Sequence, residues 1–559
     1  MNKKILPSVS VIILCLAISA APVVGAEVPG IFKRYFQDVY PARVGLGPNA
    51  LSRMAAPGGV LPLPEQAAIE LALQSNFDVN LERHSPLVAR EDIRRQHAAF
   101  DPTARFNFLW DRLTSPTTSI LAGGNQITEI RTDYNFGYRK DYQNGAGFEV
   151  KADGNRFRTT NAFASLVPAF NTNFEVIVRQ QLLQGFGTAL GAYRIRIARN
   201  NVVISEEEFR RKVTDVVLQA QDRYWELVFA GEDIKVKQES MDLANAILKQ
   251  NRDRLEVGSA ARLEVIQSEA EVAARREELI RSQYTYRRIQ DQLVKMISSY
   301  QDPREFSGEI QPVSPIQLPA ASGNDFKPLF QYAREHRPEV MQAELDINNR
   351  RINLESARNQ LKPRLDLQAS YKQVGLGGTR LIRDFSGGIF NAPIIEIAPG
   401  GWGNSLRQLF SADFSGYTLG FNFQVPIFND EARAEHATAL VELNRADMRK
   451  LSVEQTVALE VRDALTQLDM NRARLEAAQA AVRSARERLN GEQERFNVGM
   501  STTRDLIEAQ RDLTSAESVE VRAKVDLIKS DSVLDKATGA TFPKHRIDLK
   551  QALAQNLSQ

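Results

Sequence analysis

The chain contains two copies of one pattern, and this duplication constrains the fold more than any other feature of the sequence. Residues 213–300 align with residues 454–541 without a gap when they are shifted by 241 positions. Apolar positions agree along this length, and each copy carries the pattern Arg-x-x-Val-Gly, at Arg254–Gly258 and at Arg495–Gly499. Near the start of each half the matching residues are 261 positions apart. The region between the two matched stretches is therefore 20 residues longer in the first half. The match indicates an internal duplication, and we expect both halves to fold alike.

Each half ends in two very long helices. Glu206–Gln250 and Glu431–Asn490 contain no proline and one glycine, and they are rich in residues that favour helices. Apolar residues recur at intervals of three and four. At 1.5 Å per residue, sixty residues extend about 90–100 Å, which is typical of a coiled coil or a helical tube. We predict helix pairs at about 190–256 with 260–299 and at about 430–497 with 501–540, and a shorter first helix in each half at about 63–99 and 326–361.

Four segments between the helices alternate apolar and polar residues. Their apolar positions fall at every second residue within Ala104–Trp110, Phe174–Val178, Leu365–Tyr371 and Tyr417–Val425. One apolar face and one polar face are typical of a strand of an outer-membrane β-barrel. One such segment would equally fit an ordinary half-buried sheet, but four in symmetric places favour the barrel.

A further pair of alternating segments flanks Asn144-Gly145, which is typical of a hairpin turn. The sequence leaves open whether this hairpin, at about 134–150, joins the barrel. Four strands cannot close a barrel, because the smallest known barrels have about eight. Two copies of the chain would supply eight strands, and three copies would supply twelve. Since Pro102 and Pro363 open strands directly after helices, we expect the barrel to continue into a helical tube.

The N-terminus is predicted to be a secretory signal peptide, residues 1–26. It begins with two lysines, continues with an apolar run at Val9–Ala21, and ends in Val24-Gly25-Ala26, a suitable cleavage site. Cys15 lies within the apolar run and follows a leucine, which argues against a lipoprotein signal. It is the only cysteine, so we expect the mature chain to have no disulfide and no thiol chemistry.

The remaining boundaries follow from composition and from the duplication. A Gly- and Pro-rich start predicts an extended arm, and a segment with four prolines predicts a linker without regular structure. The predicted parts are the arm 27–62; the first repeat 63–301, with strands at about 103–182 and a helical hairpin at 188–300; the linker 302–325; the second repeat 326–541, with strands at about 364–426 and a helical hairpin at 430–540; and a tail, 542–559.

Several short motifs occur in an order that matches a known family. They are Gln181–Gly187 (QLLQGFG), Arg337–Val340 (RPEV), Val425–Asn429 (VPIFN) and the paired Arg-x-x-Val-Gly sites. With the duplicated order of helices and strands, they resemble the TolC family of outer-membrane efflux and secretion ducts, over nearly all of the mature chain. The resemblance implies a mainly α fold with a membrane β-barrel. It implies a trimer with four strands per chain, whose twelve-stranded barrel continues into a periplasmic tunnel of long antiparallel coiled-coil helices.

The resemblance also implies a function and partners. A trimeric exit duct in outer-membrane lipid would carry small compounds, or polypeptides in type I secretion, together with a periplasmic adaptor and an inner-membrane transporter of the RND or ABC type. The helix tips would contact the adaptor, and their glycines would supply the positive φ of the turn. The alternative for Arg254 and Arg495 is that they are ordinary basic residues at the C-terminal end of a helix, where the helix dipole favours a positive charge. The tip residues are Arg254, Val257, Gly258, Arg495, Val498 and Gly499.

Acidic residues just beyond the second tip are candidates for a gate. Asp505 and Glu508 have the i, i+3 spacing that places both on one helix face, and Glu264 corresponds to Asp505 in the first half. By similarity, these positions match the acidic rings at the closed inner end of the family's tunnel. Such rings would favour cations, and crowding would raise some carboxylate pKa values. The alternative is a solvated outer face of a long helix.

An enzyme is not expected. The five histidines are scattered, and the sequence contains no H-E-x-x-H, G-x-S-x-G or Walker A motif. We expect no cofactor and no metal. Without residues 1–26 the chain has 69 basic and 69 acidic residues, so we expect no nucleic-acid partner. The competing hypothesis is a soluble periplasmic coiled-coil scaffold, which explains the helices but not the amphipathic strands. The sequence does not identify the cargo.

Overall fold

The structure is a computed structural model that describes residues 59–117, 124–259, 261–298, 308–319, 325–384, 386–388 and 392–547. These residues belong to one compact unit, Asn49–Asp548. The predicted signal peptide, most of the arm and most of the tail lie outside the described residues. None of the described helices is both long enough and apolar enough to cross a membrane.

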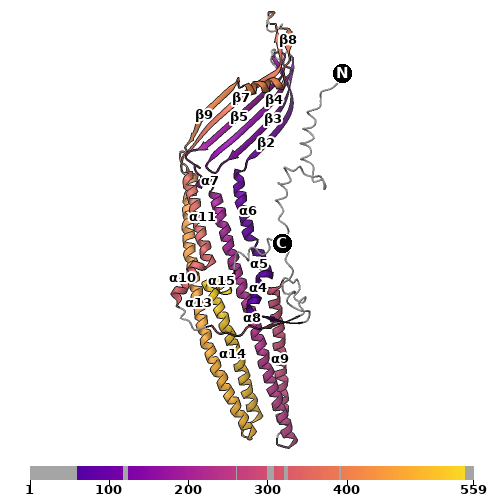
Figure 1. Ribbon diagram of the computed structural model, residues 1–559, viewed down its shortest axis with the longest axis vertical. Coiled ribbons are helices and arrows are strands. Elements are labelled where there is room, and N and C mark those ends of the chain that lie inside the picture. The colour runs from indigo at the N-terminus through magenta and orange to yellow at the C-terminus, as the bar shows by residue number, and fades with distance from the viewer. Residues whose placement is uncertain are drawn as a thin grey trace, which may run out of the picture. The chain divides into compact units, whose positions relative to one another are not determined.

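The four long helices confirm the prediction from the sequence. They form two antiparallel hairpins, one in each half of the chain (Figure 1). Buried apolar residues hold each hairpin together, for example Val461 and Leu468 of one helix against Ala523 and Leu527 of the next. The long helices are α8 (Tyr193–Glu256), α9 (Arg262–Ile297), α13 (Asp430–Asn497) and α14 (Thr503–Thr538), and the short helix α7 (Thr188–Gly191) precedes α8.

The first helix of each half is broken where the prediction had one continuous helix. In the first half, Asn76 ends one helix, and its side chain accepts the backbone N–H of Asp78 in the next. In the second half the break precedes Pro338, because a residue before proline avoids the helical region. Arg337 there has φ −75° and ψ 128°. The pieces are α4 (Glu65–Ser75), α5 (Phe77–Glu82), α6 (Ser85–His97) with the 3₁₀ turn η1 (Ala98–Phe100), α10 (Phe326–His336) and α11 (Pro338–Gln360).

One antiparallel sheet joins the strands of both halves. Its long strands are ordered β2-β3-β4-β5-β7-β9, and the short β8 pairs with β7 beyond the end of β9. Figure 1 shows the long helices leaving one end of this sheet. The strands are β2 (Thr103–Pro116), β3 (Gln126–Asp141), β4 (Ala146–Thr159), β5 (Leu166–Gln181), β7 (Arg364–Arg383), β8 (Ile394–Ala398) and β9 (Ser415–Gln424).

The sheet has six long strands where the resemblance implied four. The hairpin at Asn144-Gly145 is confirmed, and Gly145 has the positive φ, +82°, that such a turn requires. Its strands β3 and β4 lie between β2 and β5 and pair along nearly their whole length. They join because they alternate in the same way, so that Phe136 faces Phe106 on one side and Ala152 on the other.

The register separates an apolar face from a polar face. The apolar face carries Phe108, Phe174 and Phe421. On the polar face, Asn155 donates to Asp133, and Asn171 donates to Asn155. Each strand is therefore amphipathic in the sense that the sequence predicted. The outermost long strands, β2 and β9, leave one edge each without a strand partner among the described residues.

The arm and the linker contain a small sheet that the sequence analysis did not predict. β1 (Val60–Leu63) pairs in parallel with β6 (Glu309–Pro312), within the segment that the prolines were expected to keep irregular. Proline is tolerated in both strands, at Pro62 and at Pro312, because each strand of a two-stranded sheet is an edge strand. The hydroxyl of Tyr224 donates to Leu63 O at 3.0 Å, which fixes the small sheet to α8.

Two further short helices follow β8 and α14. α12 (Trp402–Ser411) lies between β8 and β9 and packs on the large sheet. α15 (Thr541–His545) turns back on α14, where Lys544 pairs with Asp531 at 2.7 Å and with Asp535. Neither helix was predicted from the sequence.

Candidate functional site

The tips of the two long hairpins have the same backbone structure. In the first tip, Ser259 N donates to Arg254 O at 2.7 Å around Gly258, which has φ +73°. In the second, Met500 N donates to Arg495 O at 2.7 Å. Gly499 there has φ +77°. Both are Schellman turns with glycine in the left-handed region, which confirms the predicted positions of the turns.

The tips differ in what their arginines contact. The Arg254 guanidinium lies 4.8 Å from the ring centroid of Phe496, so it connects the first tip to the second. Arg495 instead donates to Glu492, one turn earlier in its own helix, at 2.9 Å. The apolar side chains at the ends are exposed, at 77% for Val257 and 71% for Val498. The tips therefore present small apolar surfaces at the ends of rigid hairpins.

Asp505 lies in the first turn of α14 and closes a capping box. Its carboxylate accepts from the Thr502 hydroxyl at 2.7 Å, and its backbone N–H donates to the Thr502 hydroxyl oxygen at 3.3 Å. The hydrogen bond from Thr502 lowers the pKa of Asp505. The pKa of Asp505 is thus lowered within one chain, whereas we expected the crowding of carboxylates in a ring to raise it. In the first half, Ala261 occupies the cap position and cannot make the box.

The other two acidic candidates lie close by but in different contacts. Glu508 is exposed, and its nearest cation is Arg488 of α13 at 3.8 Å. Glu264, in the first turn of α9, accepts from the Thr503 hydroxyl at 3.3 Å. Asn251 of α8 also donates to Thr503, at 3.2 Å. The two hairpins are therefore joined just above the tips, next to the predicted gate residues.

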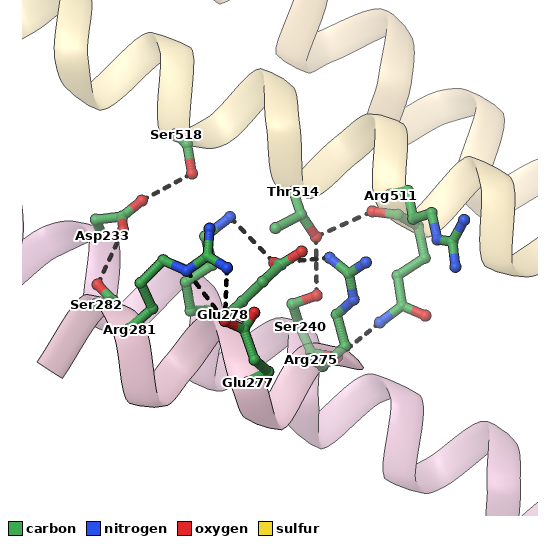
Figure 2. A network of polar contacts seen from close by, with 12 residues as sticks. Asp233, Ser240, Arg275, Glu277, Glu278, Arg281, Ser282, Arg511, Thr514 and Ser518 are labelled. Atoms are coloured by element: carbon green, nitrogen blue, oxygen red, sulfur yellow. Dashed lines mark hydrogen bonds and ion pairs between the residues drawn. The ribbon is translucent and has the colours of Figure 1, made fainter. Parts of the chain in front are cut away.

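A larger polar network, which the sequence analysis missed, joins α14 to α8 and α9. Figure 2 shows it from close by. Ser518 of α14 donates to Asp233 of α8 at 2.9 Å, and Ser282 of α9 donates to the same carboxylate at 2.9 Å. The Thr514 hydroxyl donates to Ser240 at 3.0 Å. Each of these bonds connects the two halves of the chain or the two helices of the first hairpin.

Glu271 of α9 is the most buried charge of this network. It accepts two hydrogen bonds from Arg511 of α14, one of them from Nε at 3.2 Å. It also pairs with Arg275 of its own helix at 2.9 Å. The side chain of Glu271 is 3% exposed, so the two arginines must offset the cost of burying its charge. The i, i+4 spacing of Glu271 and Arg275 was visible in the sequence, but the partner on α14 was not.

These features have a counterpart in a known family. A family model described as outer membrane efflux protein matches residues 151–299 and 329–540, which is more than half of the chain. The chain belongs to the outer membrane efflux protein family.

Three relatives show how this outer membrane efflux protein compares with others. BepC, an outer membrane efflux protein of Brucella suis biovar 1 (strain 1330), is 22% identical over 371 residues, or 65% of this chain and 71% of BepC. AprF, an alkaline protease secretion protein of Pseudomonas aeruginosa, is 27% identical over 128 residues, or 23% of this chain and 27% of AprF. The solved outer membrane channel CmeC of Campylobacter jejuni has the same fold. The TM-score is 0.57 at 16% identity, over 88% of this chain and 89% of CmeC.

The resemblance to the TolC family is confirmed. This outer membrane efflux protein is an outer-membrane duct for efflux or secretion, with a helical periplasmic part. The apolar face of its sheet therefore lies against lipid, and the long hairpins extend into the periplasm. A soluble scaffold does not account for the family match. The domain boundaries and the roles of the gate and tip residues stay predictions.

Proposed function

We propose that three copies of this chain form one exit duct for small compounds, working with a periplasmic adaptor and an inner-membrane pump of the RND or ABC type. The observation that carries this proposal is the large sheet, whose edge strands β2 and β9 have no strand partner among the described residues. Unpaired backbone groups cost several kcal/mol each in lipid. The edges must therefore pair with other copies in the membrane.

The strand directions fit such a closed ring. β2 runs away from the helices and β9 runs back toward them, so β9 of one copy and β2 of the next would meet antiparallel. Two copies would give twelve strands and three would give eighteen. We choose three because the family forms trimers. Barrel diameter grows roughly linearly with strand number, so the barrel would be about 1.5 times as wide as the twelve-stranded barrel that the resemblance implied.

The cargo proposal follows from the relatives. The match to the efflux protein BepC extends over most of the chain, whereas the match to the secretion protein AprF extends over less than a quarter. We therefore favour small compounds over polypeptides. We also infer that the chain itself has no enzymatic role and needs no cofactor, because it belongs to a family of channels.

The hairpin tips are proposed to contact the adaptor. This contact is supported by two exposed valines, Val257 and Val498, which directly precede the glycines of the two turns. Exposed apolar groups on a rigid end are suited to a protein partner. The phenyl ring of Phe496 under Arg254 keeps both tips together, so that one adaptor hairpin could contact both.

The proposed gate lies just above the tips. Threefold symmetry would turn Asp505, Glu508 and Glu264 into rings of carboxylates, which favour cations. The network around Glu271 and Arg511 would hold α14 against the first hairpin in the closed state. Opening would then require these contacts to break.

The mass of the detergent-purified protein tests the proposal. We expect a particle of three chains that is recovered from the outer-membrane fraction. A stable single chain that keeps its β-sheet in detergent would refute the trimer. Recovery of the protein in the soluble periplasmic fraction would instead support the scaffold.

A further inference from the structure

α12 packs on the large sheet over two glycines of β7, Gly375 and Gly377, which we call the floor of α12. A Cβ atom added at Gly375 would lie 2.1 Å from Ser405 O, and one added at Gly377 would lie 2.4 Å from Gly401 O. Ser405 is fully buried, and its hydroxyl donates to Gly375 O at 3.0 Å. The helix is thus built into the sheet and is not a loosely attached loop.

The register places α12 on the lipid-facing side. Gly375 lies opposite Thr172, and Phe174, two residues along the same strand, points to the same face. The ring of Trp402 in α12 packs edge-on against Tyr134 and at a tilt against Phe170, which also belong to the apolar face. α12 therefore lies outside the predicted barrel, on the side that carries the exposed phenylalanines.

On strands β7 and β9, α12 lies at the outer end of the apolar band. On β7 the apolar side chains of this face end at Tyr371, and on β9 the last is Tyr417. The next pair on this face is polar, Gln373 opposite Ser415. The floor of α12 begins directly beyond this pair, at Gly375. Tyrosine at such a boundary is typical of the interface between acyl chains and headgroups.

α12 also contacts a stretch of β7 that lies between two partner strands. β7 pairs with β9 up to Gln373 and with β8 from Arg380, which leaves a gap between them. Within this gap, Leu376 N donates to the Gln408 side chain at 2.7 Å, and Val374 N donates to Phe414 O at 3.0 Å. Backbone groups at the membrane need such partners. The Gln408 side chain of α12 thus satisfies one backbone N–H of β7 that no strand reaches among the described residues.

The free surface of α12 has an apolar side and a polar side. Leu406 and Phe410 are four residues apart and are exposed at 42% and 81%. Asn404, six residues before Phe410 and about 120° from it around the helix, is exposed on the polar side, and the exposed Arg407 lies between the two sides. Beside the apolar side is a groove of about 350 Å³ between α12 and strands β3, β4 and β5. The groove is lined by Tyr134, Ala152, Thr172, Trp402, Leu406 and Leu409, among others.

We propose that α12 is an interfacial helix that binds membrane lipid, with an acyl chain in the groove beside it and Phe410 inserted in the same leaflet. The occupant is lipid because the groove is continuous with the sheet face that already lies against lipid. A second copy is a poor fit, since copies would meet at β2 and β9 while the groove lies over the inner strands β3 to β5. An apolar helix side next to a polar side is typical of interfacial helices.

Spin labels on single cysteines test this proposal. Phe410→Cys and Asn404→Cys would each be labelled in the full chain, without its signal peptide, and reconstituted in phosphatidylcholine vesicles. Accessibility to oxygen reports lipid, and accessibility to a water-soluble nickel chelate reports water. We expect the oxygen-to-nickel ratio at 410 to exceed that at 404. A label at Phe421→Cys gives the reference for the lipid-facing sheet, and one at Val257→Cys gives the reference for water.

Each other outcome overturns the proposal. A ratio at 410 equal to the water reference would show that α12 does not touch lipid. Low accessibility to both reagents would show that protein covers the helix. If the label at Phe421→Cys reports lipid in the same experiment, the sheet is in the membrane. The failure then concerns α12 alone and not the proposed barrel. In Gly375→Ala, which pushes α12 from its floor, the ratio at 410 is expected to fall while the trimer mass stays unchanged.

Discussion

The contact between Arg511 and Glu271 should control how readily the duct opens. Arg511→Ala removes two charge-assisted hydrogen bonds between α14 and α9. Such bonds contribute about 1.5–3 kcal/mol each when well buried. Two bonds at the lower end would give about 3 kcal/mol, and because the Arg511 side chain is 55% exposed, we discount this by half for solvent screening, to about 1.5 kcal/mol for the pair. A loss of this size corresponds to an open-to-closed ratio about tenfold higher per chain.

Glu271→Ala should have a larger effect. It removes the same link and also leaves Arg275, whose side chain is 10% exposed, with only Glu278 as a partner at 2.8 Å. Breaking one side of a buried ion pair costs about 3–5 kcal/mol. We therefore expect this variant to open more often and to unfold at a lower temperature than Arg511→Ala.

Single-channel recording in planar bilayers measures the fraction of time that the duct is open. Arg281→Ala is the matched control, because among the described residues Arg281 pairs with Glu277 alone, on its own helix and at the surface (Figure 2). It should change the open fraction little, since an exposed i, i+4 pair is worth about 0.2–0.5 kcal/mol. The double variant Glu271→Ala/Arg511→Ala should open no more often than Glu271→Ala. Purely additive effects, or an open fraction in Arg511→Ala equal to that of the control, would refute the reasoning.

Three other changes have defined outcomes. Gly499→Val forces a β-branched residue to positive φ at a cost of about 1–2 kcal/mol, and should reduce export in a drug-susceptibility assay with the trimer intact; Gly491→Val, in open space without positive φ, should not. Asp505→Ala/Glu508→Ala should weaken cation selectivity in planar bilayers, and unchanged selectivity would place both carboxylates outside the lumen. Burial raises the pKa of Asp535 to about 6 from its ordinary 3.8, so its contribution to stability is full below pH 3.8 and is lost as the pH rises through 6. The protection factor of α15 in hydrogen exchange, which corrects for the intrinsic pH dependence of exchange, should therefore fall between pH 5 and pH 7.5, and Asp535→Asn should remove this fall.

The sequence predicted the parts of the fold that depend on local pattern. The long helices, the tip glycines and the amphipathic strands each repeat a short period or require one residue type, and the duplication showed each of them twice. Gly258 and Gly499 supply the positive φ that the turns require, and the structure has both turns at these two positions.

The parts that the sequence did not predict depend on contacts between distant residues. β1 and β6 pair across about 250 positions, and nothing in either segment indicates the other. The bond from Arg511 to Glu271 connects positions 240 apart. The capping box of Asp505 is a local pattern, Thr502 followed by an acid three residues later, and could have been found from the sequence. The apolar residues of α12, Trp402, Leu406, Leu409 and Phe410, recur at intervals of three and four, so this helix also could have been found from the sequence.

Electron cryo-microscopy of the protein purified from outer membranes tests the central proposal most directly. We predict a threefold particle in which β2 of each copy pairs with β9 of the next, which closes an eighteen-stranded barrel above the helical hairpins. A single copy with both sheet edges unpaired, or a ring closed by two copies with twelve strands, would contradict the account.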